Sequence, residues 1–246
     1  MITLGIDLAS QPERTGACVV EWHRGGAAVR SVVCGATDAE LLDRMRDVSR
    51  VGIDVPFGWP DAFVDLVTAH HRGAPAAVAH VADLRYRETD REVHRLTGRW
   101  PLSVSSDLIA VPTFRAARLL TALAARGEPV DRAGGGKCVE AYPAAALERW
   151  GFEAAGYKGA DGRERRRALL QAIEARTAAW LTLDDPLRAT CADKDDALDA
   201  LVAALVARAA ALGLCEPVPE ASRARAAREG WIALPTRDSL DRLARG

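Results

Sequence analysis

Two copies of one tripeptide each place an aspartate at the end of a short apolar segment. Gly5-Ile6-Asp7 ends the first segment, and Gly52-Ile53-Asp54 ends another further along the chain. Aspartate is depleted in strand interiors, so its recurrence in the same local context indicates a shared purpose. If the two strands pair in parallel, their backbones lie about 4.8 Å apart. The two carboxylates then lie side by side, with the glycines leaving room over them.

Two carboxylates in that position repel one another strongly. At a separation of about 5 Å and an effective dielectric constant of about 20, the repulsion is roughly 3 kcal/mol. A shared proton, an arginine or a divalent cation relieves such repulsion. The alternative is that the two aspartates only cap the loops that follow their strands.

A third group of carboxylates stands at the start of the last long predicted helix. Asp195 and Asp196 begin this helix, and Asp196 and Asp199 lie one turn apart on the same face. Beyond Asp199 the helix is apolar on all sides, which predicts that it is buried and that this carboxylate needs a partner. For Asp195 and Asp196 the alternative is that they cap the helix and complement its dipole.

These stretches together offer carboxylate oxygens from two strands and one helix. No cluster of histidine and cysteine at metal-ligand spacing accompanies them, so the set suits Mg²⁺ or Mn²⁺ better than zinc. A site with two such ions activates water and stabilises the leaving oxygen in phosphoryl chemistry. We therefore predict Asp7, Asp54 and Asp199 as metal ligands, and these three with Asp196 as the catalytic set.

The pattern of the remaining chain predicts a sheet that positions these side chains. Alternating apolar residues and turn signals predict strands over residues 2–8, 17–22, 28–34, 51–55 and 137–141. Helices are expected from Thr37 or Asp38 to about residue 48, near 61–71, up to about 97, and over 114–126, 143–150, 163–180 and 195–212. This order predicts one α/β domain over residues 1–246, with a five-stranded mixed sheet flanked by helices and a mostly helical insertion, residues 57–112, after strand four. The tail residues 231–234 are expected to form an edge strand or a lid.

With these features the chain resembles the ribonuclease H-like superfamily, and more closely the domain-of-unknown-function 429 family of predicted nucleases of that fold. The matching stretches cover nearly the whole chain: residues 5–9, 53–58, 87–90, 140–143, 157–158, 195–200 and 229–232. The resemblance implies active-site carboxylates at Asp7, Asp54 and Asp199, with Asp196 one turn earlier, as in Holliday-junction resolvase-like members. Many superfamily members carry a further acidic residue on a helix after strand four, for which this chain shows no single counterpart.

Six further residues are candidate substrate contacts. Arg87 is expected to hold a phosphate and Asp90 to orient it or a metal; the alternative is a helix start with Thr89 as cap and Glu92 in a capping box. Glu140 follows the fifth strand and either points into the site or closes the strand. The chain contains only three lysines, each beside another motif, and they are expected to supply local cations, with solvated surface positions as the alternative: Lys137, Lys158 and Lys194.

The composition narrows the class of protein. With 49% hydrophobic and 27% charged residues in a chain of 246, a packed core is expected, which excludes disordered and collagen-like chains. Five scattered cysteines predict a reducing compartment, and the N-terminus lacks the basic leader of a signal peptide. The longest apolar run, residues 200–207, is far shorter than a membrane span. We expect a cytoplasmic protein without a membrane partner.

The function predicted from these observations is a divalent-metal-dependent nuclease that hydrolyses phosphodiester bonds in nucleic acid. With a net charge of −1, the chain has no overall positive potential that would attract nucleic acid. The prediction therefore depends on the carboxylates. One alternative is a non-catalytic module of the same fold that binds nucleic acid or protein. Another is a relative of actin-like ATPases or sugar kinases with residues 10–16 as the phosphate loop, although such proteins normally contain two lobes of this fold.

Overall fold

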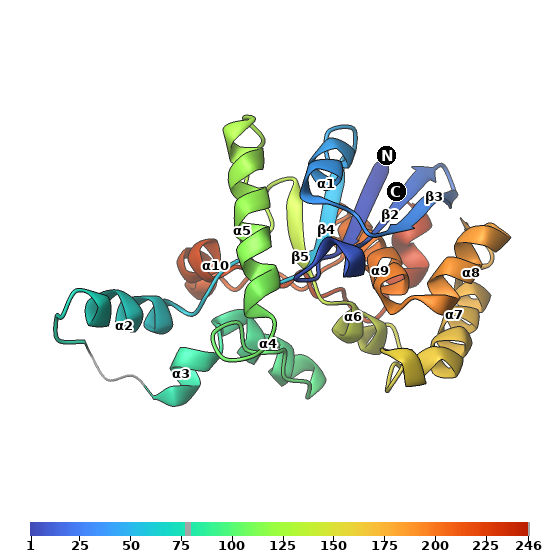
Figure 1. The fold of residues 1–246 in the computed structure, drawn as a ribbon. Coiled ribbons are helices and arrows are strands. Elements are labelled where there is room, and N and C mark those ends of the chain that lie inside the picture. Colours follow the sequence, from blue (N-terminus) through green and yellow to red (C-terminus); the bar gives the residue numbers. More distant parts are fainter. Residues whose placement is uncertain (77–79, 246) are drawn as a thin grey trace.

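A mixed sheet forms the centre of the computed structural model, which describes residues 1–76 and 80–245; residues 77–79 of the predicted insertion and Gly246 lie outside the described residues. The strand order is β5-β4-β1-β2-β3-β6 (Figure 1). The strands are β1 (Ile2–Asp7), β2 (Gly16–His23), β3 (Gly26–Cys34), β4 (Arg50–Asp54), β5 (Cys138–Ala141) and β6 (Leu181–Thr182). β1, β2 and β3 form the predicted antiparallel meander, whereas the pairs β1–β4, β4–β5 and β3–β6 are parallel.

The described sheet has six strands where five were predicted. The additional strand, β6, pairs with Ala27 and Ala28 of β3, and the backbone N–H of Ala27 donates to the carbonyl oxygen of Trp180 at 2.6 Å. The helix predicted over 163–180 therefore ends earlier, as α7 (Arg163–Thr177). Two residues are too few to display the alternation that marks a strand, which is why the sequence pattern missed β6.

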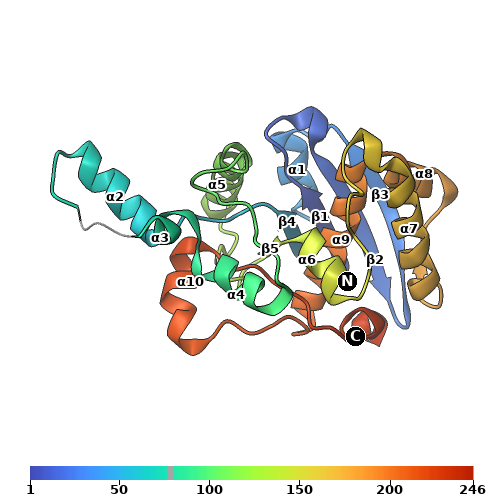
Figure 2. The ribbon, with the colours of Figure 1, turned by 90° about the horizontal axis from the view of Figure 1, so that it is seen from below.

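Helices cover both faces of the sheet (Figures 1 and 2). Besides α7 they are α1 (Asp38–Arg44), α2 (Asp61–His71), α3 (Val81–Arg85), α4 (Glu88–Thr97), α5 (Ala110–Ala125), α6 (Pro143–Arg149), α8 (Asp185–Asp193), α9 (Asp195–Ala211) and α10 (Arg223–Glu229). α1 begins as predicted, because Thr37 and Glu40 form a capping box. The short helices α3, α8 and α10 have no counterpart among the predicted elements.

Each face of β1 packs against a different group of helices. Leu4 and Ile6 join one buried cluster with Leu41 of α1 and Leu119 of α5. The opposite face lies on α9, which is buried along almost its entire length. The alternation predicted for this strand therefore separates two cores, and it directs Asp7 to the α9 face.

Glycines let α9 approach the sheet backbone directly. Gly5 and Gly52 are register partners in the parallel β1–β4 pair. A Cβ atom on Gly5 would lie 1.9 Å from the carbonyl oxygen of Ala200, and one on Gly52 would lie 2.2 Å from that of Ala203. The two glycines therefore make room for the backbone of α9, which corrects the expectation that they clear space over the carboxylates.

The segment between β4 and α5 extends to one side of the sheet. α2 projects away from the sheet in both views and buries none of its residues (Figures 1 and 2). At the C-terminal end of the chain, the predicted edge segment reduces to a single bridge between Ile232 and Glu140 of β5. Within the described residues, we find no helix of the length and apolarity that a membrane crossing requires.

Candidate functional site

Asp7 and Asp54 lie next to each other at the carboxyl ends of β1 and β4. They are register partners, which confirms the predicted parallel pairing of the two strands. Both side chains are only partly exposed, and Asp199 of α9 is fully buried. Burial raises the pKa of Asp7 well above its usual range, and the charges of Asp199 and Asp54 raise it further. Burial also raises the pKa of Asp54 to about 7, against an opposing effect of Lys158. The three carboxylates therefore share one electrostatic environment.

Two consecutive residues of the loop before α7 hold Asp199. The hydroxyl of Tyr157 donates to Oδ1 of Asp199 at 2.5 Å, and Nζ of Lys158 lies 2.7 Å from Oδ2. Tyr157 is buried, whereas 52% of the Lys158 side chain is exposed. Burial acts to lower the pKa of Lys158, but Asp199 and Asp54 together raise it well above the usual value. Tyr157 stood in a stretch of family resemblance without an assigned role, and the structure reveals its contact.

Asp196 has a separate partner, Arg14. Nε of Arg14 donates to Oδ2 of Asp196 at 3.0 Å, and Nη2 donates to Oδ1 at 3.2 Å. Arg14 belongs to a short 3-10 helix, Pro12–Arg14, in the loop between β1 and β2. The charge of Asp196 still raises the pKa of Asp7, so Asp196 lies at the border of the same site. An exposed arginine in a loop carries no sequence signal for this contact, and our sequence analysis missed it.

The candidate metal ligands are of the chemical type that binds a hard divalent cation. All candidate ligands are carboxylate oxygens, which Mg²⁺ and Mn²⁺ prefer. Oδ2 of Asp199 is buried and forms an ion pair with Lys158. No described residue donates a hydrogen bond of acceptable geometry to this oxygen. Yet among residues 1–76 and 80–245, no three acidic, histidine or cysteine side chains lie close enough to hold an ion as they stand. The cation nearest to Asp199 is the ammonium of Lys158.

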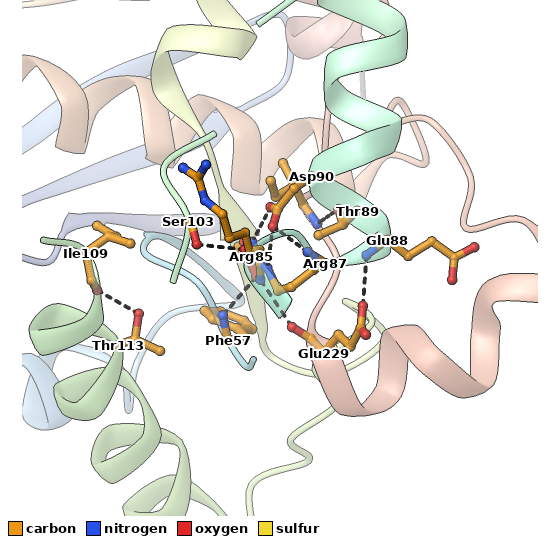
Figure 3. A network of polar contacts seen from close by, with 12 residues as sticks. Phe57, Arg85, Arg87, Glu88, Thr89, Asp90, Ser103, Ile109, Thr113 and Glu229 are labelled. Carbon is orange, nitrogen blue, oxygen red and sulfur yellow. Dashed lines mark hydrogen bonds and ion pairs between the residues drawn. The ribbon is translucent and has the colours of Figure 1, made fainter. Parts of the chain in front are cut away.

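Arg87, predicted to hold a phosphate, directs all of its donors into the protein (Figure 3). Its guanidinium contacts Asp90 at 2.8 and 3.2 Å and Glu140 at 2.7 and 2.9 Å. Nη1 also donates to the carbonyl oxygen of Glu229 at 3.1 Å. An arginine has five N–H donors, and these contacts use all of them. Because Arg87, Asp90 and Glu140 are buried and paired with one another, the structure supports a positioning role for them, while Arg87 and Glu140 also line the pocket beside the carboxylates.

Thr89 does not cap α4. The helix begins at Glu88, and the Asp90 carboxylate accepts a hydrogen bond from the backbone N–H of Arg87 at 2.9 Å. The hydroxyl of Thr89 instead accepts from the backbone N–H of Ile232 at 2.9 Å. The alternative capping box of the sequence analysis is therefore corrected, since Asp90, not Glu92, closes the start of this helix.

Glu140 and Glu229, the latter labelled in Figure 3, extend this network to neighbouring elements. The Glu229 carboxylate accepts the backbone N–H groups of Asp61 and Glu88, each at 2.8 Å, at the starts of α2 and α4. The Glu140 carboxylate accepts the backbone N–H of Phe57 at 2.9 Å, in the loop that follows β4. The network therefore fixes the chain directly beyond Asp54 to β5, α4 and the C-terminal segment.

A small pocket, open to solvent, adjoins the carboxylates. Asp54 and Lys158 line it on one side, and Tyr142 follows β5 into its wall. Most other lining residues are apolar and include Leu102 and Ile109 from the segment between β4 and α5. Because Asp54 and Lys158 belong to both the pocket and the carboxylate cluster, a molecule in the pocket lies against the candidate site.

The other two predicted lysines have different surroundings. Nζ of Lys137 donates to Oε1 of Glu128 at 2.9 Å and to the carbonyl oxygen of Arg46 at 3.2 Å. Lys137 immediately precedes β5 and therefore lies at the opposite end of that strand from Ala141, the register partner of Asp54. Lys194 is an exposed residue at the start of α9. Lys158 is thus the lysine that the structure brings to Asp199.

Comparison with known proteins gives one match. The model of a family described as "Protein of unknown function (DUF429)" matches residues 5–224. This range contains Asp7, Asp54, Asp196 and Asp199, together with Lys158, and it ends before Glu229. No curated protein and no solved structure matches the chain significantly.

Proposed function

The chain belongs to this family of unknown function, and from its carboxylate cluster we propose that it is a divalent-metal-dependent phosphodiesterase that acts on nucleic acid. The observation that carries the proposal is the in-register pair Asp7–Asp54 beside Asp199: burial raises the pKa values of both, and the charge of Asp199 adds to the rise. Three acidic groups from separate parts of the chain thus share one site. Such an excess of negative charge at a partly exposed position favours binding of a divalent cation.

The arrangement of the sheet supports the same proposal. An antiparallel β1–β3 meander, β4 parallel to β1, and an acidic last long helix packed on β1 are the features of the resemblance to the ribonuclease H-like superfamily. We infer that the chain has this fold, with β6, α8 and the segment between β4 and α5 as additions. The resemblance also accounts for the contribution of one carboxylate each by β1, β4 and α9.

Within this proposal the side chains have different roles. Asp7, Asp54 and Asp199 hold Mg²⁺ or Mn²⁺, which supplies activation of water and stabilisation of the leaving oxygen. Burial raises the pKa of Asp54 to about 7 in the metal-free protein, so a proton and the metal ion compete for this carboxylate near neutral pH. Arg14 is 64% exposed beside the site and offers a planar guanidinium suited to a backbone phosphate of the substrate.

The test compares metal binding and cleavage in three proteins: the wild type, Asp7→Asn and Asp47→Asn. Asp47 is an exposed residue before β4, at the end of that strand remote from Asp54, and it provides the matched control. We expect Asp7→Asn to lose Mn²⁺ binding in calorimetry and to lose Mn²⁺-dependent cleavage of labelled DNA and RNA oligonucleotides. Asp47→Asn should retain both. Unchanged Mn²⁺ affinity in Asp7→Asn would remove the proposal.

A further inference from the structure

Lys158 occupies the position that the proposed function requires for a cation. Its Nζ lies 2.7 Å from Oδ2 of Asp199, and its charge lowers the pKa values of Asp7 and Asp54. One ammonium group therefore serves as counter-ion to three carboxylates.

A metal ion bound to Asp199 would compete with Lys158 for the same oxygen. The hydroxyl of Tyr157 takes Oδ1 of Asp199, so Oδ2 is the oxygen left for a cation. A magnesium ion binds a carboxylate oxygen at about 2.1 Å. An ammonium group on the same oxygen at 2.7 Å would then face a divalent charge at contact distance. The repulsion between the two cations therefore disfavours simultaneous occupancy of this oxygen.

The backbone around Lys158 is fixed, while its side chain borders solvent. Nη1 of the buried Arg166 donates to the carbonyl oxygens of Tyr157 at 2.7 Å and Gly159 at 3.2 Å. The backbone N–H of Gly159 donates to Oδ2 of Asp195 at 2.8 Å. With 52% of its side chain exposed, Lys158 can leave Asp199 by rotating its own side-chain bonds into solvent.

We propose that Lys158 is a displaceable internal counter-ion, whose ammonium holds Asp199 until a divalent cation takes Oδ2 and the lysine swings out. This inference rests on the proposed function, since it concerns the same site. The exchange keeps the carboxylates neutralised in the absence of metal, and metal affinity then includes the cost of breaking one ion pair. Because Lys158 also lines the adjoining pocket, the displaced ammonium remains beside the site.

The test measures Mn²⁺ affinity of the full chain by calorimetry, for the wild type, Lys158→Met, Lys158→Gln and the control Arg24→Met. Both uncharged variants at position 158 should bind Mn²⁺ about tenfold more tightly, because the ion no longer displaces or repels an ammonium group. Arg24→Met removes an exposed cation directly after β2, at the end of that strand remote from Asp7, and should bind like the wild type. Thermal unfolding in EDTA gives a second measurement: the uncharged variants at position 158 should melt at a lower temperature than the wild type and regain this loss in Mn²⁺.

The outcomes separate this inference from the proposed function. Tighter binding by Lys158→Met or Lys158→Gln supports the exchange, including the case in which only these variants bind Mn²⁺. Unchanged or weaker binding by both, beside measurable binding by the wild type, overturns the exchange and leaves the metal-dependent function standing. Lack of Mn²⁺ binding in the wild type and in both variants overturns the exchange together with the metal-dependent function.

Discussion

Replacement of Asp54 by asparagine should stabilise the protein at neutral and alkaline pH when no divalent cation is supplied. Burial raises the pKa of this carboxyl from its ordinary value of 3.8 to about 7; Lys158 opposes the rise and Asp199 adds to it. Folding therefore disfavours the ionised form of Asp54. Asparagine has nearly the same shape and carries no charge, so the variant avoids the free-energy cost of ionising this position in the folded state.

The sign and size follow from proton linkage. Between pH 3.8 and about 7 the folded state binds a proton that the unfolded state has released, so stability falls as the pH rises. The free energy of unfolding lost by this titration, accumulated from pH 3.8 up to pH values above 7, is about 4 kcal/mol in total, at about 1.4 kcal/mol per pKa unit. Roughly half of it, about 2 kcal/mol, is lost between about pH 5.5 and about pH 8. Asp7, whose pKa is also raised, contributes with the same sign.

The assay is urea unfolding in EDTA at these two pH values, for the wild type, Asp54→Asn and the exposed control Asp47→Asn. We expect Asp54→Asn to exceed the wild type in free energy of unfolding at both pH values, with a gain about 2 kcal/mol larger at about pH 8. Asp47→Asn should follow the wild type. An equal difference at both pH values, or an Asp54→Asn protein less stable than the wild type at about pH 8, would refute the reasoning about this carboxylate.

Three further substitutions test the surrounding structure. Gly5→Ala places a Cβ atom 1.9 Å from the carbonyl oxygen of Ala200 and should lower the free energy of unfolding in urea by about 3 kcal/mol or more, whereas a loss below about 1 kcal/mol would contradict the close packing of α9 on β1. Arg87→Met leaves Asp90 and Glu140 buried without their counter-charge and should cost about 3–5 kcal/mol in the same assay; a neutral effect would contradict the positioning role. Tyr157→Phe removes the donor to Oδ1 of Asp199 and should weaken Mn²⁺ binding severalfold in calorimetry; unchanged affinity would show that this hydrogen bond does not orient the ligand.

The pairing of β1 with β4 was predictable because local signals in two places agree. A strand pattern of period two assigns Asp7 and Gly5 to one face, and the repeated Gly-Ile-Asp tripeptide assigns Asp54 and Gly52 in the same way. Parallel pairing in the observed register then brings like residues together. The reason for the glycines was not predictable, because it depends on the backbone of α9, which approaches from a distant part of the chain.

The roles of the charged residues outside the aspartates depended on contacts that no sequence pattern contains. Arg87 and Lys158 both stood in stretches of family resemblance and both offered a cation for a phosphate. In the structure Arg87 is buried between Asp90 and Glu140, while Lys158 reaches Asp199 from a partly exposed loop position. Whether a cation is available to a substrate depends on burial and on the acceptors around it, and both are properties of the folded chain.

The amino-acid sequence by itself determined the alternation of the strands, the long apolar helix behind Asp199, and the supply of carboxylates on one face. These features follow from the local periodicity of apolar and polar residues, which can be read directly from the sequence. Only the tertiary structure decided that α9 lies on Gly5 and Gly52, that Arg14 pairs with Asp196, and that Lys158 neutralises the cluster. The partners in each of these contacts come from separate elements, so their proximity exists only once the sheet and its helices have packed together.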